Sequence, residues 1–201
     1  MIRNLVFDYG KVLVNYDFAR LFRDLIPDEG KRQAFAGFIN DPARVEVFDL
    51  GFKNFEGVVE DFISERPDFE QELRLFAAHK TEAIFEQVPG MYELLSQLKS
   101  EGFRLYGLTN WDTLIYDTLE QFEIFRLLDG MVISSEVHTV KPHPQIYGIL
   151  FDKYGLVPQE CVFADDKAEN VLGGRALGME GVVFRNVRQY EDELRALLES
   201  R

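Results

Sequence analysis

Short apolar runs bounded by polar or turn-forming residues recur along the chain and predict five β-strands. From about residue 91 onward, these runs alternate with segments whose apolar residues recur every three or four positions, as in amphipathic helices. Alternation of this kind predicts an α/β fold, a Rossmann-like parallel sheet flanked by helices on both faces. The predicted strands are Asn4–Asp8, Arg104–Thr109, Gly130–Ser134, Cys161–Asp165 and Gly181–Phe184.

The alternation is interrupted after the first predicted strand. Between about residues 16 and 88 the apolar spacing is helical, as at Phe18, Leu21 and Phe22, and no strand is predicted. Pro89-Gly90 marks the return to the α/β pattern. We therefore predict an α/β core domain of residues 1–14 and 89–201, with a small helical cap domain of residues 15–88 inserted after the first strand.

Composition narrows the class of protein. The chain has 201 residues, of which 46% are hydrophobic and 28% charged, as in ordinary globular domains. A net charge of −13 argues against binding to nucleic acid or to an anionic membrane, because both need a basic surface. The single cysteine, Cys161, fits a reducing compartment, and no apolar run approaches the roughly 20 residues of a membrane span. These features predict a cytoplasmic protein.

Polar side chains follow the predicted strands where each strand ends. Because the carboxyl ends of parallel strands share one edge of the sheet, where ligands bind, we expect these side chains to converge. Lys141, in the segment Lys-Pro-His-Pro before a predicted helix, is expected to join them. The converging set is Asp8, Thr109, Asn110, Lys141, Asp165, Asp166 and Asn170.

This set indicates phosphate chemistry. Clustered carboxylates repel one another unless a cation compensates them, and a set of oxygen ligands suits Mg²⁺. A lysine ammonium beside them can neutralise a bound anion. A carboxylate such as Asp8 can attack phosphorus as a covalent nucleophile. Backbone N–H groups after the first strand and the Thr109 hydroxyl can hold the remaining phosphate oxygens.

In this order the motifs resemble the haloacid dehalogenase superfamily over nearly the whole chain, with the helical insert at the place of a C1-type cap. The matching segments are FDYGKVL (7–13), LTN (108–110), KPHPQIY (141–147) and VFADDKAEN (162–170). The resemblance implies an α/β hydrolase in which Asp8 is the nucleophile and Thr109 and Lys141 bind the transferring phosphoryl group. Asp8, the Gly10 carbonyl, Asp165 and Asp166 would hold Mg²⁺. Substrate contacts would come from Tyr9, Gly10, Asn110, Trp111 and Asn170.

Gly10 departs from the pattern of the family's phosphatases, which usually carry a second Asp as general acid/base two residues after the nucleophile. Loss of a positioned acid or base typically costs about 10² to 10⁴ in rate. The D-x-G-x-V form that begins at Asp8 resembles a phosphatase subgroup that includes glucose-1-phosphate phosphatases, in which the same position lacks the acid. A sugar anomeric phosphate departs more easily than a simple alkyl phosphate.

Three functions remain open at this point. The first is a Mg²⁺-dependent phosphomonoesterase that acts on a small phosphorylated metabolite, with sugar phosphates among the candidates. The second is a metal-independent 2-haloacid dehalogenase, a branch that also lacks the second Asp but typically has serines at the positions of Asp165 and Asp166. The third is a binding or regulatory protein that has kept the fold and lost catalysis, for which Gly10 is the only support.

Overall fold

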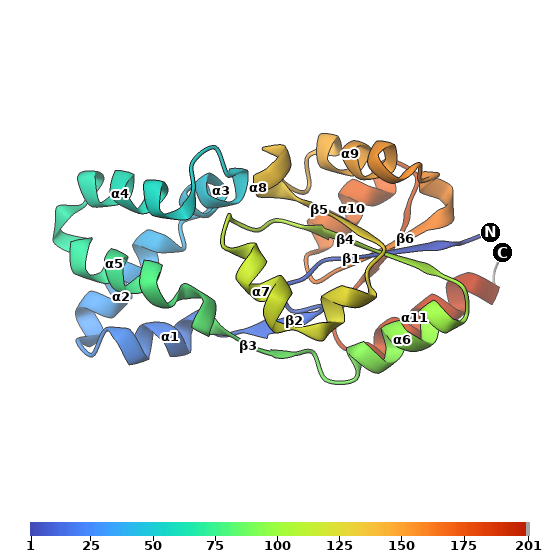
Figure 1. Cartoon of the computed structure of the whole chain (residues 1–201), viewed down its shortest axis with the longest axis horizontal. Coiled ribbons are helices and arrows are strands. Elements are labelled where there is room, and N and C mark those ends of the chain that lie inside the picture. Colours follow the sequence, from blue (N-terminus) through green and yellow to red (C-terminus); the bar gives the residue numbers. More distant parts are fainter. Residues whose placement is uncertain (200–201) are drawn as a thin grey trace.

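The computed structural model describes residues 1–199 and has a five-stranded parallel sheet at its centre (Figure 1). The strands stand in the order β5-β4-β1-β6-β7, so the chain leaves the central strand in both directions. All five predicted strands are confirmed to within one residue at each end. They are β1 (Asn4–Phe7), β4 (Arg104–Thr109), β5 (Gly130–Ile133), β6 (Cys161–Asp165) and β7 (Glu180–Val183).

Helices cover both faces of this sheet, which confirms the predicted α/β class. Alternate residues of β1 face opposite ways: Leu5 and Phe7 join one apolar cluster, and Val6 joins the other. One face carries α6 (Met91–Ser100), α7 (Ile115–Gln121) and α11 (Val187–Glu199), and the other carries α9 (Pro144–Tyr154) and α10 (Ala168–Ala176). Among residues 1–199, no helix has the length and apolar character needed to cross a membrane.

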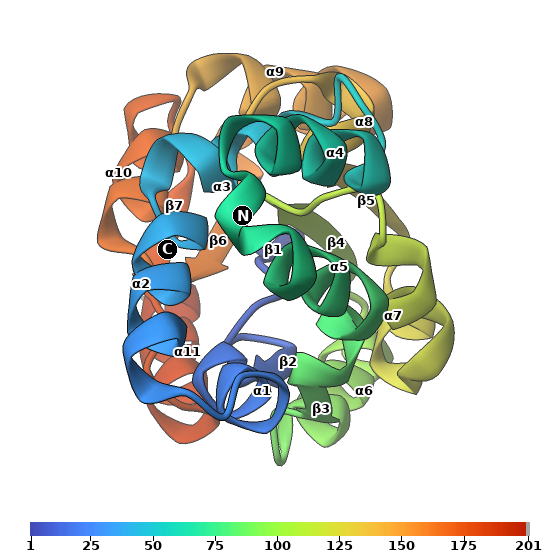
Figure 2. The same cartoon turned by 90° about the vertical axis from the view of Figure 1, so that its left-hand side faces the viewer.

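A second group of helices lies beyond one end of the sheet (Figures 1 and 2). Its apolar side chains form a cluster of their own that is rich in phenylalanine, including Phe22, Phe35 and Phe76 in edge-to-face contact. Asp17, Asp28, Asp41 and Asn54 cap the first four of these helices at their N-termini. The helices are α1 (Phe18–Leu25), α2 (Glu29–Ile39), α3 (Pro42–Leu50), α4 (Phe55–Glu65) and α5 (Glu70–His79).

Two short strands join this helical group to the sheet, and the prediction that residues 16–88 contain no strand is wrong. Antiparallel pairing links β2 (Val14–Tyr16) with β3 (Ile84–Gln87), and the register shifts between Asn15 and Tyr16. The chain therefore enters and leaves the helical group through one two-stranded ribbon beside the carboxyl end of β1.

Candidate active site

The centre of the site is a buried ion-pair triad. Asp8 follows β1, Asp165 ends β6, and the Lys141 ammonium lies 2.8 Å from Asp8 Oδ1 and 2.7 Å from Asp165 Oδ2. The ammonium also donates to the Leu108 carbonyl at 2.8 Å, which uses all three of its protons. Burial alone would lower the pKa of Lys141, but the two carboxylates raise it above its usual value, so the ammonium stays charged.

Asp166 completes a cluster of three carboxylates. One oxygen from each of Asp8, Asp165 and Asp166 lies within 4.8 Å of the others. Burial, reinforced by the two neighbouring carboxylates, raises the pKa of Asp166 to about 6. Burial also raises the pKa of Asp8, and the Lys141 ammonium opposes that rise. One lysine thus leaves the three carboxylates with an excess of negative charge, which a divalent cation would compensate.

Hydrogen bonds fix this cluster in place. The Asn170 side-chain amide donates to both carboxylate oxygens of Asp165, at 3.0 and 3.1 Å, and the Lys167 backbone N–H donates to Asp165 Oδ1 at 2.8 Å. Asn110 exchanges two hydrogen bonds with the backbone of Lys141, at 2.7 and 3.0 Å. Asn110 and Asn170 therefore hold the lysine segment and the β6 carboxylate in position.

The Thr109 hydroxyl is buried at the end of β4 and has no hydrogen-bond partner in the protein. A buried hydroxyl without a partner costs about 1 to 3 kcal/mol. Thr109 lines the same cavity as Asp8 and Lys141, so an anion bound there could supply the missing acceptor. This orphaned donor fits a phosphoryl oxygen.

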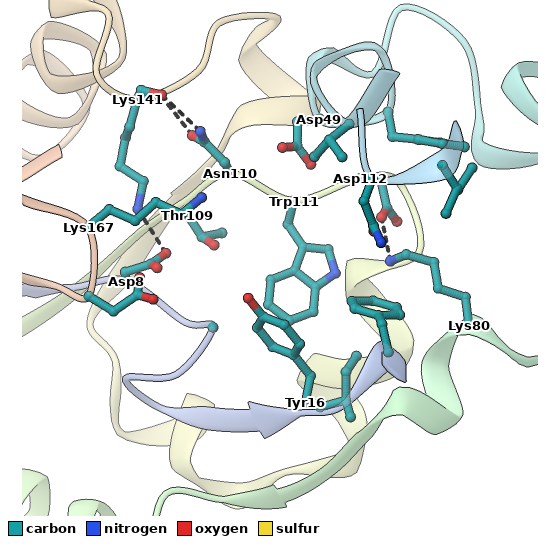
Figure 3. Close-up of a pocket in the computed structure, with 18 of the residues that line it drawn as sticks. Asp8, Tyr16, Asp49, Lys80, Thr109, Asn110, Trp111, Asp112, Lys141 and Lys167 are labelled. Atoms are coloured by element: carbon teal, nitrogen blue, oxygen red, sulfur yellow. Dashed lines mark hydrogen bonds and ion pairs between the residues drawn. The ribbon is translucent and has the colours of Figure 1, made fainter. Parts of the chain in front are cut away.

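These groups line one side of a cavity of about 190 Å³ (Figure 3). The figure shows Lys141 reaching Asp8, while Tyr16 and Trp111 stand side by side farther along. Trp111 is held by a hydrogen bond from its backbone N–H to Ser134 Oγ, at 2.9 Å, and its ring both packs in the core and lines the cavity. The predicted site residues in the cavity wall are Asp8, Gly10, Thr109, Asn110, Trp111, Lys141, Asp166 and Asn170.

The prediction that Tyr9 contacts substrate needs correction. Its side chain is fully buried on the core side of β1, with its ring 4.8 Å from that of Phe125, and it does not line the cavity. A Cβ on Gly107 would lie 2.2 Å from the Tyr9 hydroxyl, so this glycine makes room for the tyrosine. Successive residues of an extended chain point to opposite sides, and Asp8 faces the cavity.

The other side of the cavity comes from the helical group, and its polar residues had no signal in the sequence. Lys80, in a 3-10 helix at Lys80–Ala83, forms a buried ion pair with Asp112 at 2.5 Å. Asp49, near the end of α3, also lines the cavity. Burial, followed by the nearby Asp112 carboxylate, raises the pKa of Asp49 to about 7. Tyr16 of β2 completes this set.

The fold and the site together define a hydrolase of the haloacid dehalogenase type. The family model for haloacid dehalogenase-like hydrolases matches residues 2–178, and the chain belongs to this family. A solved structure of a haloacid dehalogenase family enzyme from Bacteroides thetaiotaomicron has the same fold, with a TM-score of 0.76 at 20% identity. The match covers 92% of this chain and 96% of that one.

Curated relatives include phosphatases. A phosphatase of Mycobacterium tuberculosis is 25% identical over 209 residues, which cover 95% of this chain and 91% of that protein. A flavin mononucleotide hydrolase of Arabidopsis thaliana is 27% identical over 150 residues. That match covers 73% of this chain and 59% of the plant protein, so the chain spans little more than half of this relative. The protein is thus a haloacid dehalogenase-like hydrolase with phosphatases among its relatives.

Proposed function

We propose that the protein is a Mg²⁺-dependent phosphomonoesterase that acts on a small phosphorylated metabolite through an aspartyl-phosphate on Asp8. The observation that carries the proposal is the cluster of Asp8, Asp165 and Asp166 around the Lys141 ammonium, beside the unpartnered Thr109 hydroxyl. The Bacteroides enzyme with the same fold was solved with magnesium and inorganic phosphate, and the Mycobacterium relative is a phosphatase.

The carboxylates of Asp8, Asp165 and Asp166 and the carbonyl of Gly10 would hold the Mg²⁺. Bound there, the ion would neutralise charge on the carboxylates and on the phosphoryl oxygens. An Asp8 oxygen attacks phosphorus; the Asp8 oxygen–phosphorus bond forms as the bond to the bridging oxygen breaks. Lys141 and Thr109 donate to the oxygens of the transferring group. Water then hydrolyses the acyl phosphate and restores the Asp8 carboxylate.

We also propose that residues 15–88 act as the cap over this site, in the C1-type position that the sequence resemblance implies. A cap excludes water and contacts the leaving group. The cap contributes several apolar side chains to the cavity wall, which favours a leaving group with an apolar face over a polyol. These side chains are Phe18, Ile39, Val45, Phe48, Phe76 and Ile84.

A phosphatase screen tests this function. The panel contains glucose 1-phosphate, nucleotides, aryl phosphates and p-nitrophenyl phosphate, each with Mg²⁺ and with a chelator. We expect Asp8→Asn to lower turnover by more than about 10³-fold, because it removes the nucleophile. The control Asp152→Asn changes an exposed aspartate of α9, outside the cavity. Turnover that survives Asp8→Asn or chelation would contradict the proposal.

The dehalogenase alternative is tested in parallel. Asp165 and Asp166 would repel an anionic haloacid unless a cation offset their charge. We therefore expect no halide release from 2-chloropropionate in metal-free buffer. Halide release there that is lost in Asp8→Asn would support the dehalogenase instead. Binding of one phosphorylated ligand without turnover of any ester would favour the regulatory protein.

A further inference from the structure

The ring of Tyr16 fills the space above Gly10, the position at which the protein lacks the acidic side chain of related phosphatases. A Cβ added to Gly10 would lie 2.9 Å from Tyr16 Cε1, 3.6 Å from Cδ1 and 3.9 Å from Cζ. The first distance is shorter than real Cβ contacts, so no larger side chain fits at position 10 while the Tyr16 ring stays in place. The two residues are sterically matched.

Local structure holds Tyr16 in this orientation. The register of the β2–β3 ribbon shifts between Asn15 and Tyr16, and such an irregularity re-aims the side chain that follows it. The Lys11 ammonium donates to the Tyr16 carbonyl and lies 4.4 Å from the centre of the Tyr16 ring. The Phe18 ring packs on it with a centroid distance of 5.4 Å. The ring is therefore fixed from the ribbon and from the start of α1.

The Tyr16 hydroxyl lies on the same side of the cavity as the carboxylate cluster. Figure 3 shows the ring rising from β2 toward the space between Asp8 and Trp111. Burial raises the pKa of Tyr16 to about 12, and the next largest influences are the carboxylates of Asp166 and Asp8. The hydroxyl is thus within electrostatic range of both, and it has no acceptor assigned among the cavity residues.

We propose that Tyr16 takes over the place of the missing side chain at position 10 and that its hydroxyl donates a hydrogen bond to the bridging oxygen of the phosphate ester. This inference rests on the proposed phosphatase function. As the bond between phosphorus and the bridging oxygen breaks, negative charge gathers on that oxygen, and the phenol stabilises it while keeping its own proton. The departing alkoxide then takes a proton from water.

The first test removes only the hydroxyl. Tyr16→Phe is compared with the wild type on an alkyl phosphate, whose alkoxide leaves poorly, and on p-nitrophenyl phosphate, whose anion leaves unaided. We expect kcat/KM to fall about 10-fold for the alkyl ester and less than about 2-fold for the nitrophenyl ester. Tyr116→Phe is the control, because Tyr116 is an exposed tyrosine of α7 outside the cavity. Equal losses on both esters, or no loss on either, would overturn the proposal.

The second test concerns the shared space. Gly10→Asp alone must displace the Tyr16 ring, so we expect it to lower turnover of both esters. In a Tyr16→Ala background the same substitution has room, and we expect turnover of the alkyl phosphate to rise above that of Tyr16→Ala alone. Equal effects of Gly10→Asp in the two backgrounds would show that Tyr16 does not occupy this space, since contacting residues give non-additive effects. Thermal unfolding of each variant checks that it is folded.

Failure of this inference can be told apart from failure of the phosphatase function. If Asp8→Asn abolishes turnover but Tyr16→Phe does not discriminate between the esters, only the role of Tyr16 is overturned. If the wild type shows no turnover that depends on Asp8, both proposals fall.

Discussion

Replacement of Lys141 by methionine tests the charge balance at the centre of the site. Methionine fills a similar volume without the ammonium, so Asp8 and Asp165 lose their ion pairs at 2.8 and 2.7 Å, and the Leu108 carbonyl loses its donor. The Lys141 side chain is 1% exposed and that of Asp165 fully buried, so water cannot replace the lost contacts. The variant therefore leaves buried negative charge uncompensated.

The expected cost follows from this burial. Breaking a buried ion pair by removing one partner costs about 3 to 5 kcal/mol. Asp165 keeps hydrogen bonds from Asn170 and from the Lys167 backbone, so most of the cost should arise at Asp8. For a domain of this size each kcal/mol shifts Tm by about 2 to 4 °C, which gives a fall of about 6 to 20 °C at about pH 8.

The pH dependence has a definite sign. Without Lys141, burial raises the pKa of Asp8 further above its ordinary value of 3.8, so the folded protein binds a proton more tightly than the unfolded chain. Stability of the variant relative to the wild type should therefore recover as the pH falls from about 8 to about 5.

Thermal unfolding by circular dichroism in chelator measures both effects, because the chelator keeps a metal ion from replacing the ammonium. Lys153→Met is the control, since Lys153 is an exposed residue of α9 that donates only to the Met131 carbonyl, at 3.1 Å. Its loss should cost less than about 0.5 kcal/mol. If Lys141→Met unfolds at the temperature of Lys153→Met, or if its deficit is the same at both pH values, the reasoning about buried charge is wrong.

Two further predictions concern the cavity wall. Thr109→Val removes an unpartnered buried hydroxyl, so we expect Tm to stay level or rise while inhibition by inorganic phosphate weakens about 10-fold; Thr118→Val, which removes an equally unpartnered buried hydroxyl on α7, should leave inhibition unchanged. Asp49→Asn removes a carboxyl whose pKa is raised to about 7, so it should stabilise the protein by about 1 to 2 kcal/mol at about pH 8, allowing for partial exposure. That gain should vanish toward about pH 4, where the carboxyl is protonated in both folded and unfolded states, and an equal gain at both pH values would refute the assignment.

The sheet could be predicted from the sequence because its strands are buried on both faces and therefore read as continuous apolar runs. The ribbon of β2 and β3 could not. Its strands have three and four residues, Phe85 and Glu86 of β3 are exposed, and the two strands pair across the whole helical group. No local pattern marks a pairing that depends on where both ends of an insertion meet.

The two sides of the cavity differ in the same way. Asp8, Thr109 and Asp165 could be placed from the sequence, because each stands at the carboxyl end of a parallel strand. Lys80 and Asp49 look like ordinary surface charges in the sequence, and only the docking of the helical group brings them to the cavity. The prediction for Tyr9 is wrong because a position beside a nucleophile does not fix the direction of a side chain.

This division has a consequence for how the site evolves a substrate preference. The groups proposed to carry out the chemistry stand on the sheet, but the leaving-group side is built from Tyr16, Asp49 and Lys80 on the inserted segment. Contacts across the junction fix that segment: Ser134 Oγ donates to the Asp49 carbonyl at 2.7 Å, and the Phe55 backbone N–H donates to Thr113 Oγ1 at 2.9 Å. Substitutions in the insert can therefore change the leaving group that is accepted while the carboxylate cluster and its lysine stay as they are.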